Sequence, residues 1–198
     1  MGDALRFLLQ LDQEAIRATG ELRWAPATGV LALLSAWWVK GPLLVAVGWC
    51  SDLRCKRVFP LAAVAATASF FVASWLNYVI KGVFDRSRPP EAIGFEALVG
   101  VPGSPSFPSG HAMSAFAVAA AIALIAPRLR VPVLTLAAAI AFSRVYLGVH
   151  FWIDVLVGSA LGLAIGLGVA AAMRRSAAGE LNRPHRDLVA AGPRHARE

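Results

Sequence analysis

The sequence predicts an all-α fold: a polytopic membrane bundle of five to six transmembrane helices, preceded by an amphipathic helix on the membrane surface. Hydrophobic residues make up 58% of the 198 residues, charged residues only 16%, and the mean hydropathy is +0.62. Soluble domains of this length are less apolar. Several apolar runs also approach the roughly 20 residues that a helix needs to cross a bilayer.

The amphipathic helix is predicted within residues 1–25. Apolar residues recur with helical spacing from Asp3 to Leu22, and polar residues fall on the opposite side. Such a helix can lie on the membrane surface or pack against the bundle, and the sequence leaves both positions open. Because Asp12 and Glu14 interrupt the apolar stretch, no cleavable signal peptide is expected.

The membrane domain is predicted to cover residues 26–174. Its first apolar stretch contains Trp37, Trp38 and a Gly-Pro pair at positions 41 and 42. Two interpretations fit: a short interfacial or re-entrant helix at 30–38 followed by a span at 39–53, or one kinked helix. The clearer spans are predicted at residues 58–80, 111–126, 131–149 and 152–173.

Two segments are predicted to be irregular. Residues 81–108 form a long loop rich in Pro and Gly, and long loops in compact domains are usually functional. Residues 175–198 are charged and rich in Arg, Pro, Gly and Ala, which is typical of a flexible tail. Oligomeric state cannot be inferred from either segment.

The distribution of basic residues predicts the orientation in the membrane. Eleven Lys and Arg residues lie in the connections after the first and third spans and in the tail: Arg54, Lys56, Arg57, Arg128, Arg130, Arg174, Arg175, Arg183, Arg186, Arg194 and Arg197. Basic residues concentrate on the cytoplasmic side of a membrane. The tail is therefore predicted to be cytoplasmic, and the long loop is predicted to face outward.

The net charge of +7 does not indicate nucleic-acid binding, because the basic residues are not interleaved with aromatic ones. Cys50 and Cys55 lie near basic residues without a neighbouring His cluster. Free thiols are therefore favoured over a metal site.

Three cations lie near the ends of predicted spans on the outward side: Lys81, Arg88 and Arg144. Ionisable residues in membrane segments usually mark function, and a guanidinium matches the oxygens of a phosphate. The alternative is that all three are interfacial residues whose charged ends reach the headgroups. Arg144 fits that alternative least well, because it follows an apolar run from 131 to 142.

Ser109 and Gly110 precede a strongly helical run, and His111 falls in its first turn. Ser109 can cap this helix, and the free N–H groups of a first turn bind anions. A capped helix start without a ligand is the simpler interpretation of Ser109 and Gly110. His111 favours the functional one.

His150 and Asp154 are four residues apart, so on a helix they would share a face and the carboxylate would orient the imidazole. A histidine held in this way can act as a nucleophile, and a second histidine can serve as general acid. With His111 and the three cations, the pair predicts phosphoryl transfer through a phosphohistidine.

These fragments together resemble the three-part signature of the type 2 phosphatidic acid phosphatase superfamily. The signature comprises Lys81 with Arg88-Pro89, then Pro108 to His111, then Ser143-Arg144 with His150 and Asp154, in the order and spacing of the family. The resemblance implies that Lys81, Arg88, Ser109, Gly110 and Arg144 bind the phosphoryl group. It implies that His150 attacks phosphorus, that Asp154 orients His150, and that His111 protonates the leaving group. It also implies that no metal or other cofactor is needed.

The small size and the Ala- and Arg-rich composition resemble bacterial undecaprenyl diphosphate phosphatases rather than the soluble vanadium haloperoxidases of the same superfamily. We therefore expect an integral phosphatase of the bacterial cytoplasmic membrane, with its site facing the periplasm. Its substrate would be a lipid phosphate or diphosphate: an isoprenyl diphosphate, phosphatidate or phosphatidylglycerol phosphate. The alternative is a non-catalytic protein that binds or transports lipid phosphates, which would need the cations but not both histidines.

Overall fold

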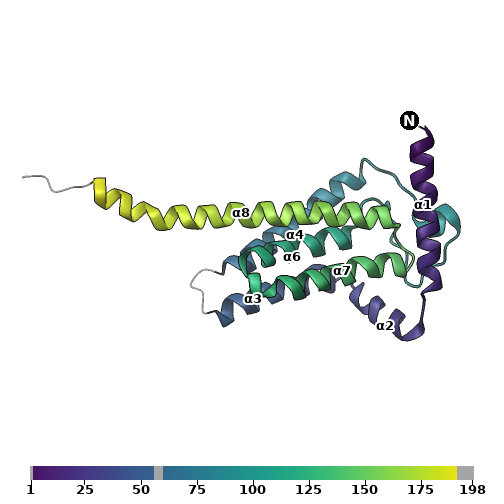
Figure 1. Cartoon of the computed structure of the whole chain (residues 1–198), viewed down its shortest axis with the longest axis horizontal. Helices are drawn as coiled ribbons and strands as arrows, with labels where there is room; N and C mark the ends of the chain where they lie inside the picture. The colour runs from purple at the N-terminus through teal and green to yellow at the C-terminus, as the bar shows by residue number, and fades with distance from the viewer. Residues whose placement is uncertain (1, 56–59, 191–198) are drawn as a thin grey trace, which may run out of the picture.

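The computed structural model describes residues 2–55 and 60–190, and every regular element in these ranges is helical, as predicted (Figure 1). Met1, residues 56–59 and residues 191–198 lie outside the described residues, and so do the start of the predicted span at 58–80 and the end of the predicted tail. The elements are α1 Gly2–Glu21, α2 Ala25–Leu34, η1 Val39–Leu43, α3 Leu44–Arg54, α4 Leu61–Lys81, α5 Pro89–Ile93, α6 Gly110–Ile125, η2 Pro127–Leu129, α7 Arg130–Tyr146 and α8 Trp152–Ala190.

Among the described residues, three helical segments are long and apolar enough to cross a membrane: Leu61–Lys81, Pro127–Tyr146 and Trp152–Ala178. The helix Gly110–Ile125 is apolar but has only 16 residues, about 24 Å at 1.5 Å per residue. The total of five to six spans and the division into residues 1–25, 26–174 and 175–198 therefore stay predictions.

The bundle is built around α6, which packs against α4, α7 and α8. Twelve of its sixteen residues are buried, and most of them are alanines. Because alanine adds little bulk, the neighbouring helices can approach the α6 backbone closely. A helix that is apolar on all sides is expected at the centre of a bundle.

The segment from α2 to α3 follows the interpretation with two helical parts. The first helix, α2, begins at Ala25 and ends at Leu34, earlier than the predicted 30–38. After a short turn, η1 and α3 continue from Val39 as one helical stretch, with Pro42 inside the π-helical part. A π-helical turn accommodates a residue that lacks an N–H donor.

Helix α1 lies across one end of the bundle, nearly perpendicular to the long helices (Figure 1). Asp12, Ile16 and Thr19 are buried and face the bundle, whereas Phe7 and Leu8 are exposed. The predicted amphipathic helix is therefore present, and it packs against the bundle with the face that carries Asp12, Ile16 and Thr19. The contact of its apolar side with the membrane surface stays a prediction.

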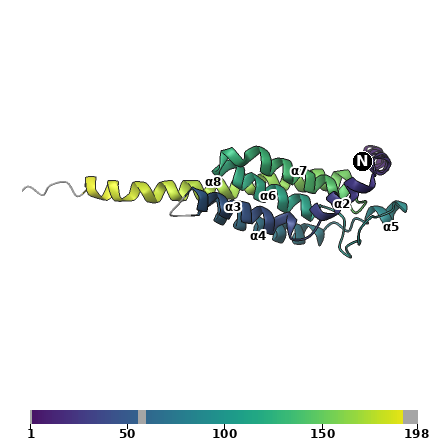
Figure 2. The same cartoon turned by 90° about the horizontal axis from the view of Figure 1, so that it is seen from below.

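The same end of the bundle carries the long loop. Figure 2 shows α5 and the connections around it beside α1. The predicted loop at 81–108 is thus interrupted by one short helix, α5, which begins at Pro89 and ends before Gly94 with φ 64°. A proline in the first turn and a left-handed glycine after the last are the usual boundaries of a helix.

The helix predicted at 131–149 ends earlier than the sequence indicated. Helix α7 ends at Tyr146, not at 149, and a turn through Gly148 leads to α8 at Trp152. Gly148 has φ 78°, and a Cβ there would lie 2.5 Å from the Glu96 carbonyl oxygen, so only glycine fits. His150 therefore lies in this turn, in the predicted connection between the spans at 131–149 and 152–173, and a shared helix face is not what brings it to Asp154.

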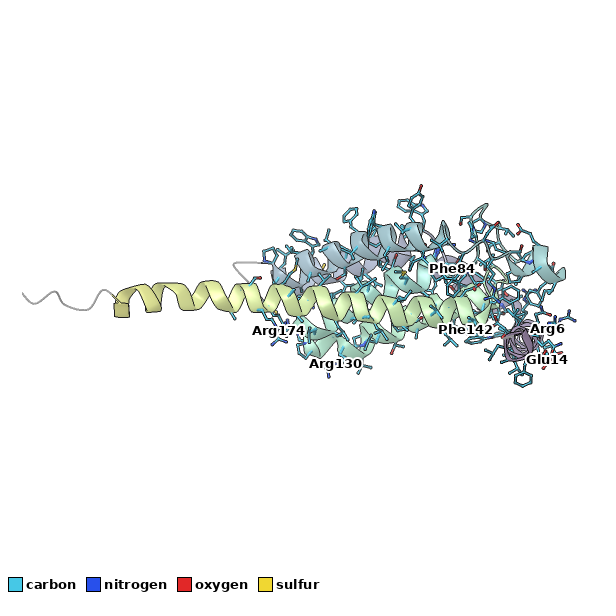
Figure 3. All side chains as sticks on the ribbon, turned by 90° about the horizontal axis from the view of Figure 1, so that it is seen from above. Arg6, Glu14, Phe84, Arg130, Phe142 and Arg174 are labelled. Atoms are coloured by element: carbon cyan, nitrogen blue, oxygen red, sulfur yellow. The ribbon has the colours of Figure 1, made fainter. Side chains whose placement is uncertain are left out.

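Helix α8 continues through Ala190, so the described part of the predicted tail is helical (Figure 1). Its flexibility stays a prediction. At this opposite end of the bundle, Figure 3 shows Arg130 and Arg174 far from Arg6 and Glu14 of α1. Two of the residues on which the predicted topology rests therefore lie at the end away from α1, and the orientation in the membrane stays a prediction.

Candidate active site

The site lies at the end of the bundle covered by α1, where α4 ends, α6 and α8 begin, and the turn after α7 passes. Two buried guanidinium groups mark it, since Arg88 is 2% exposed and Arg144 is 4% exposed. Within the described part of the chain, neither forms an ion pair with a carboxylate. A buried cation without an anionic partner is costly, so these groups are suited to binding an anion.

Arg88 contacts His150 directly. Its Nη1 lies 3.1 Å from His150 Nε2 and donates to the Val149 carbonyl at 2.7 Å. Its Nε donates to the carbonyl of Ser104 at 2.9 Å, and Nη2 lies 3.4 Å from the carbonyl of Pro105. Burial lowers the pKa of Arg88, and the carboxylates of Asp154 and Glu91 act in the opposite direction.

The other ring nitrogen of His150 faces Asp154. His150 Nδ1 lies 3.6 Å from Asp154 Oδ2 and 3.3 Å from Ser106 Oγ. We assign the proton of the neutral ring to Nδ1, because both neighbours can accept it. Nε2 then carries a lone pair on the side of Arg88, which is the arrangement that a nucleophile needs.

Burial lowers the pKa of His150 to about 3, and the Asp154 contact only partly opposes this effect. Repulsion from Arg88 and Arg144 contributes to this lowering. The imidazole is therefore neutral at physiological pH. A protonated imidazole could not attack phosphorus.

Stability is expected to fall as the pH decreases from 6.5 towards 3, because His150 of the unfolded chain binds a proton in that range and His150 of the folded chain does not. The contribution is complete above 6.5, where both states are neutral. Thermal unfolding in detergent at about pH 8 and about pH 4 should show a smaller acid-induced decrease in Tm for His150→Gln than for the wild type. An equal decrease in both proteins would contradict the buried neutral histidine.

His111 and Arg144 meet at the turn that follows α2. His111 Nε2 lies 3.0 Å from the Ser35 carbonyl oxygen, and Arg144 donates to the Ser35 hydroxyl. The backbone joins this pair to His150, because the Arg144 carbonyl accepts from the N–H of His150 at 3.3 Å. These contacts place His111 and Arg144 next to Ser35.

Ser109 and Gly110 begin α6 as predicted. The Ser109 N–H donates to the Asp154 carbonyl at 2.9 Å, which fixes the start of α6 against α8. A Cβ on Gly110 would lie 2.8 Å from Asn77 Oδ1, so a larger residue here would have to displace the Asn77 side chain, which donates to the Pro108 carbonyl. The first-turn N–H groups of α6 have no partner within the helix, which makes its start a suitable place for an anion.

Two further atoms support an anion site. Within the described part of the chain, Ser109 Oγ and Arg144 Nε are buried and have no hydrogen-bond partner. Both belong to residues that the signature implies in phosphate binding. Buried polar atoms are nearly always satisfied, so these two atoms are candidates for contacts with a bound anion.

Lys81 reaches the same region from the end of α4 and donates to the carbonyl of Pro105, which Arg88 also approaches. Beside it opens a cavity of about 570 Å³, lined by Tyr78, Val79, Lys81, Gly82, Asp85, Ser104 and Pro105. Lys81 thus lines the cavity directly, and Arg88 contacts two of its lining residues, Ser104 and Pro105. Among the described residues, no group of three or more His, Cys, Asp or Glu side chains is placed to hold a metal ion.

Four residues of this region were not predicted from the sequence: Asp12, Ser35, Arg86 and Ser106. Ser106 donates to Asp154 Oδ2 at 2.5 Å, and Arg86 donates to Asp154 Oδ1 at 2.5 Å. Only Arg86 had a signal, since it lies two residues before Arg88. The others come from segments whose position depends on the tertiary fold.

Known proteins share this sequence pattern. The chain is 40% identical over 103 residues to the decaprenylphosphoryl-5-phosphoribose phosphatase of Mycobacterium tuberculosis (strain CDC 1551 / Oshkosh), a match that covers 52% of this chain and 56% of that protein. It is 38% identical over 126 residues to the putative undecaprenyl-diphosphatase of Escherichia coli (strain K12), covering 62% and 61%. The chain thus spans little more than half the length of these curated relatives.

The fold is also shared. The structure of a transmembrane PAP2 type phosphatidylglycerolphosphate phosphatase from Bacillus subtilis superposes with a TM-score of 0.71 at 29% identity, covering 88% of this chain and 89% of that one. The profile of the PAP2 superfamily matches residues 62–177, which is more than half of the chain and includes every position of the three-part signature. The chain therefore belongs to the PAP2 superfamily, the family whose three-part signature it resembles.

Proposed function

We propose that this protein is an integral membrane phosphatase that removes a terminal phosphate from a lipid phosphate or diphosphate. One observation carries the proposal. Among the described residues, the buried side chains of Arg88 and Arg144 form no ion pair with a carboxylate, and Arg88 Nη1 lies 3.1 Å from Nε2 of the neutral His150. Such an arrangement supplies both the charge that binds a phosphoryl group and the nucleophile that attacks it.

The reaction would proceed in two displacements. The Nε2 lone pair of His150 forms a bond to phosphorus while the bond from phosphorus to the lipid oxygen breaks, and His111 donates a proton to that oxygen. Water then attacks the phosphohistidine and gives a proton to His111, which releases inorganic phosphate and restores both histidines. Lys81, Arg88, Arg144, Ser109 and Gly110 would hold the phosphoryl oxygens in both steps, so no metal is required.

Asp154 would serve the first step through His150. As the imidazole attacks, it becomes positively charged, and a carboxylate beside Nδ1–H stabilises that charge. Asp154 is fully buried, which strengthens this interaction. The carboxylate also keeps the proton on Nδ1, so that the lone pair remains on Nε2.

A polyprenyl diphosphate such as undecaprenyl diphosphate is our first candidate substrate, because two of the relatives are named for polyprenyl-linked substrates. Phosphatidate and phosphatidylglycerol phosphate follow. The tail would lie between helices while the phosphate enters from the outer face of a bacterial cytoplasmic membrane. The basic residues Arg130 and Arg174 at the other end of the bundle support that orientation (Figure 3).

The test is phosphate release by the purified protein in detergent from undecaprenyl diphosphate, phosphatidate and phosphatidylglycerol phosphate. We expect release that persists in the presence of a chelator and is inhibited by vanadate. Binding of all three lipids without release of phosphate would instead favour the non-catalytic binding protein. Release that disappears with the chelator would contradict the metal-independent mechanism.

A further inference from the structure

Two charged residues outside the signature contact the site, and the proposed reaction gives neither of them a role. Arg86 lies in the loop between α4 and α5, and Asp12 lies on α1. Arg86 bridges two carboxylates: Nη1 donates to Asp154 Oδ1 at 2.5 Å and Nη2 donates to Asp12 Oδ2 at 2.7 Å. The two carboxylate side chains are 0% and 1% exposed.

The Asp154 carboxylate is held on both oxygens. Oδ1 accepts from Arg86, whereas Oδ2 accepts from Ser106 Oγ at 2.5 Å and from the Phe151 N–H at 3.0 Å. Oδ2 is also the oxygen that faces His150 Nδ1. The Arg86 contact therefore fixes the rotation that presents Oδ2 to the imidazole.

Asp12 holds Arg86 in turn and connects α1 to α8. Its Oδ1 accepts from the Ile153 N–H at 3.1 Å, next to the start of α8, while Oδ2 accepts from Arg86. The Arg86 guanidinium also lies 4.4 Å from the centroid of the Phe151 ring. Arg86 is thus bound at three points, and one of them comes from α1.

We propose that Asp12 and Arg86 are positioning residues for the phosphatase reaction, which act on His150 through Asp154. The inference rests on the proposed function. It makes α1 part of the active site, because the series of contacts that leads from Asp12 through Arg86 and Asp154 to His150 begins on that helix. A purely structural bridge that only fastens α1 is the alternative, and it predicts a loss of stability without a change in kcat.

Arg86→Gln is expected to lower kcat about 100-fold, since a displacement of reacting groups by about 1 Å costs that much. Arg86→Lys keeps the charge but not the planar fork, and we expect a loss of about 10-fold. Asp12→Asn keeps the acceptor for Ile153 N–H, so a loss of roughly 3- to 10-fold should follow from the weaker hold on Arg86. Glu14→Gln, on an exposed position of the same helix, is the matched control and should leave kcat unchanged.

KM and the inhibition constant of inorganic phosphate should stay within about twofold in all four variants, because the residues act on orientation and not on phosphate binding. Adding Asp12→Asn to Arg86→Gln should cost little more, because Asp12 acts through Arg86. If Arg86→Gln does not fold, the kcat values of Asp12→Asn and Arg86→Lys decide between a positioning role and a purely structural bridge. Unchanged kcat in folded variants, with or without a lower Tm, would overturn the inference.

A readout without substrate separates this inference from the proposed function. In protein labelled with ¹⁵N-histidine, the His150 signal, assigned by its absence in His150→Gln, should show a proton on Nδ1. In Arg86→Gln it should show a mixture of the two neutral tautomers. If the tautomer changes in Arg86→Gln but the wild type releases no phosphate, the proposed function is wrong and the role of Arg86 in positioning His150 is retained. No shift would overturn the positioning role.

Discussion

Replacing His150 with alanine is expected to lower kcat by on the order of 10³-fold or more, because the variant lacks the group that forms the covalent intermediate. Phosphate release in detergent measures the effect, and inhibition by inorganic phosphate shows whether the cations still bind an anion. Turnover within tenfold of the wild type would exclude His150 as the nucleophile.

His111→Asn provides the matched comparison, because it removes the other histidine and leaves His150 in place. With p-nitrophenyl phosphate the leaving group needs no proton, so the first step should survive in His111→Asn while the second becomes slow. We expect a burst of p-nitrophenolate equal to the number of active sites, followed by slow turnover. His150→Ala should show no burst. A burst in His150→Ala but not in His111→Asn would exchange the two assigned roles.

The signature residues could be located from sequence because their spacing relates them to the ends of apolar runs. The structure gathers Arg88, His150 and Asp154 directly, and brings His111 and Arg144 to Ser35. Their chemical roles stay predictions. The pairing of His150 with Asp154 is present, but not through a shared helix face, because a spacing of four also arises when a turn precedes a helix and its first-turn carboxylate reaches back. The positive φ of Gly148 separates the two cases, and sequence alone does not reveal it.

There is a physical reason why the residues that hold Asp154, such as Asp12, could not be predicted from the sequence. Asp12 interrupts an amphipathic pattern, and by sequence alone it argues only against a signal peptide. It becomes part of the site once α1 crosses the end of the bundle, because α1 uses a face with Asp12, Ile16 and Thr19 beside its apolar face. A pattern of polar and apolar residues indicates which sides of a helix differ. It does not indicate which partner each side meets.

Replacing Gly166 with valine is expected to destabilise the bundle by at least about 1–3 kcal/mol, the usual cost of overpacking, and more if the backbones must separate. A Cβ at Gly166 would lie 2.1 Å from the Ala117 carbonyl oxygen, and one at Gly162 would lie 2.3 Å from that of Met113. These oxygens belong to the backbone of α6, so they cannot move aside as a side chain would. Small residues four apart allow this close approach between membrane helices.

Gly168→Val is the control, since it lies on the same helix and a Cβ there meets nothing within 4 Å. Both substitutions change helix propensity alike, so a difference between their Tm values in detergent isolates the contact with α6. Because the start of α6 is tied to α8 through Ser109 N–H and the Asp154 carbonyl, separating the two helices also moves the anion site relative to His150. Gly166→Val should therefore lose activity at temperatures below its own Tm, whereas Gly168→Val should retain it. Equal Tm values for the two variants would show that α6 and α8 do not pack through this glycine.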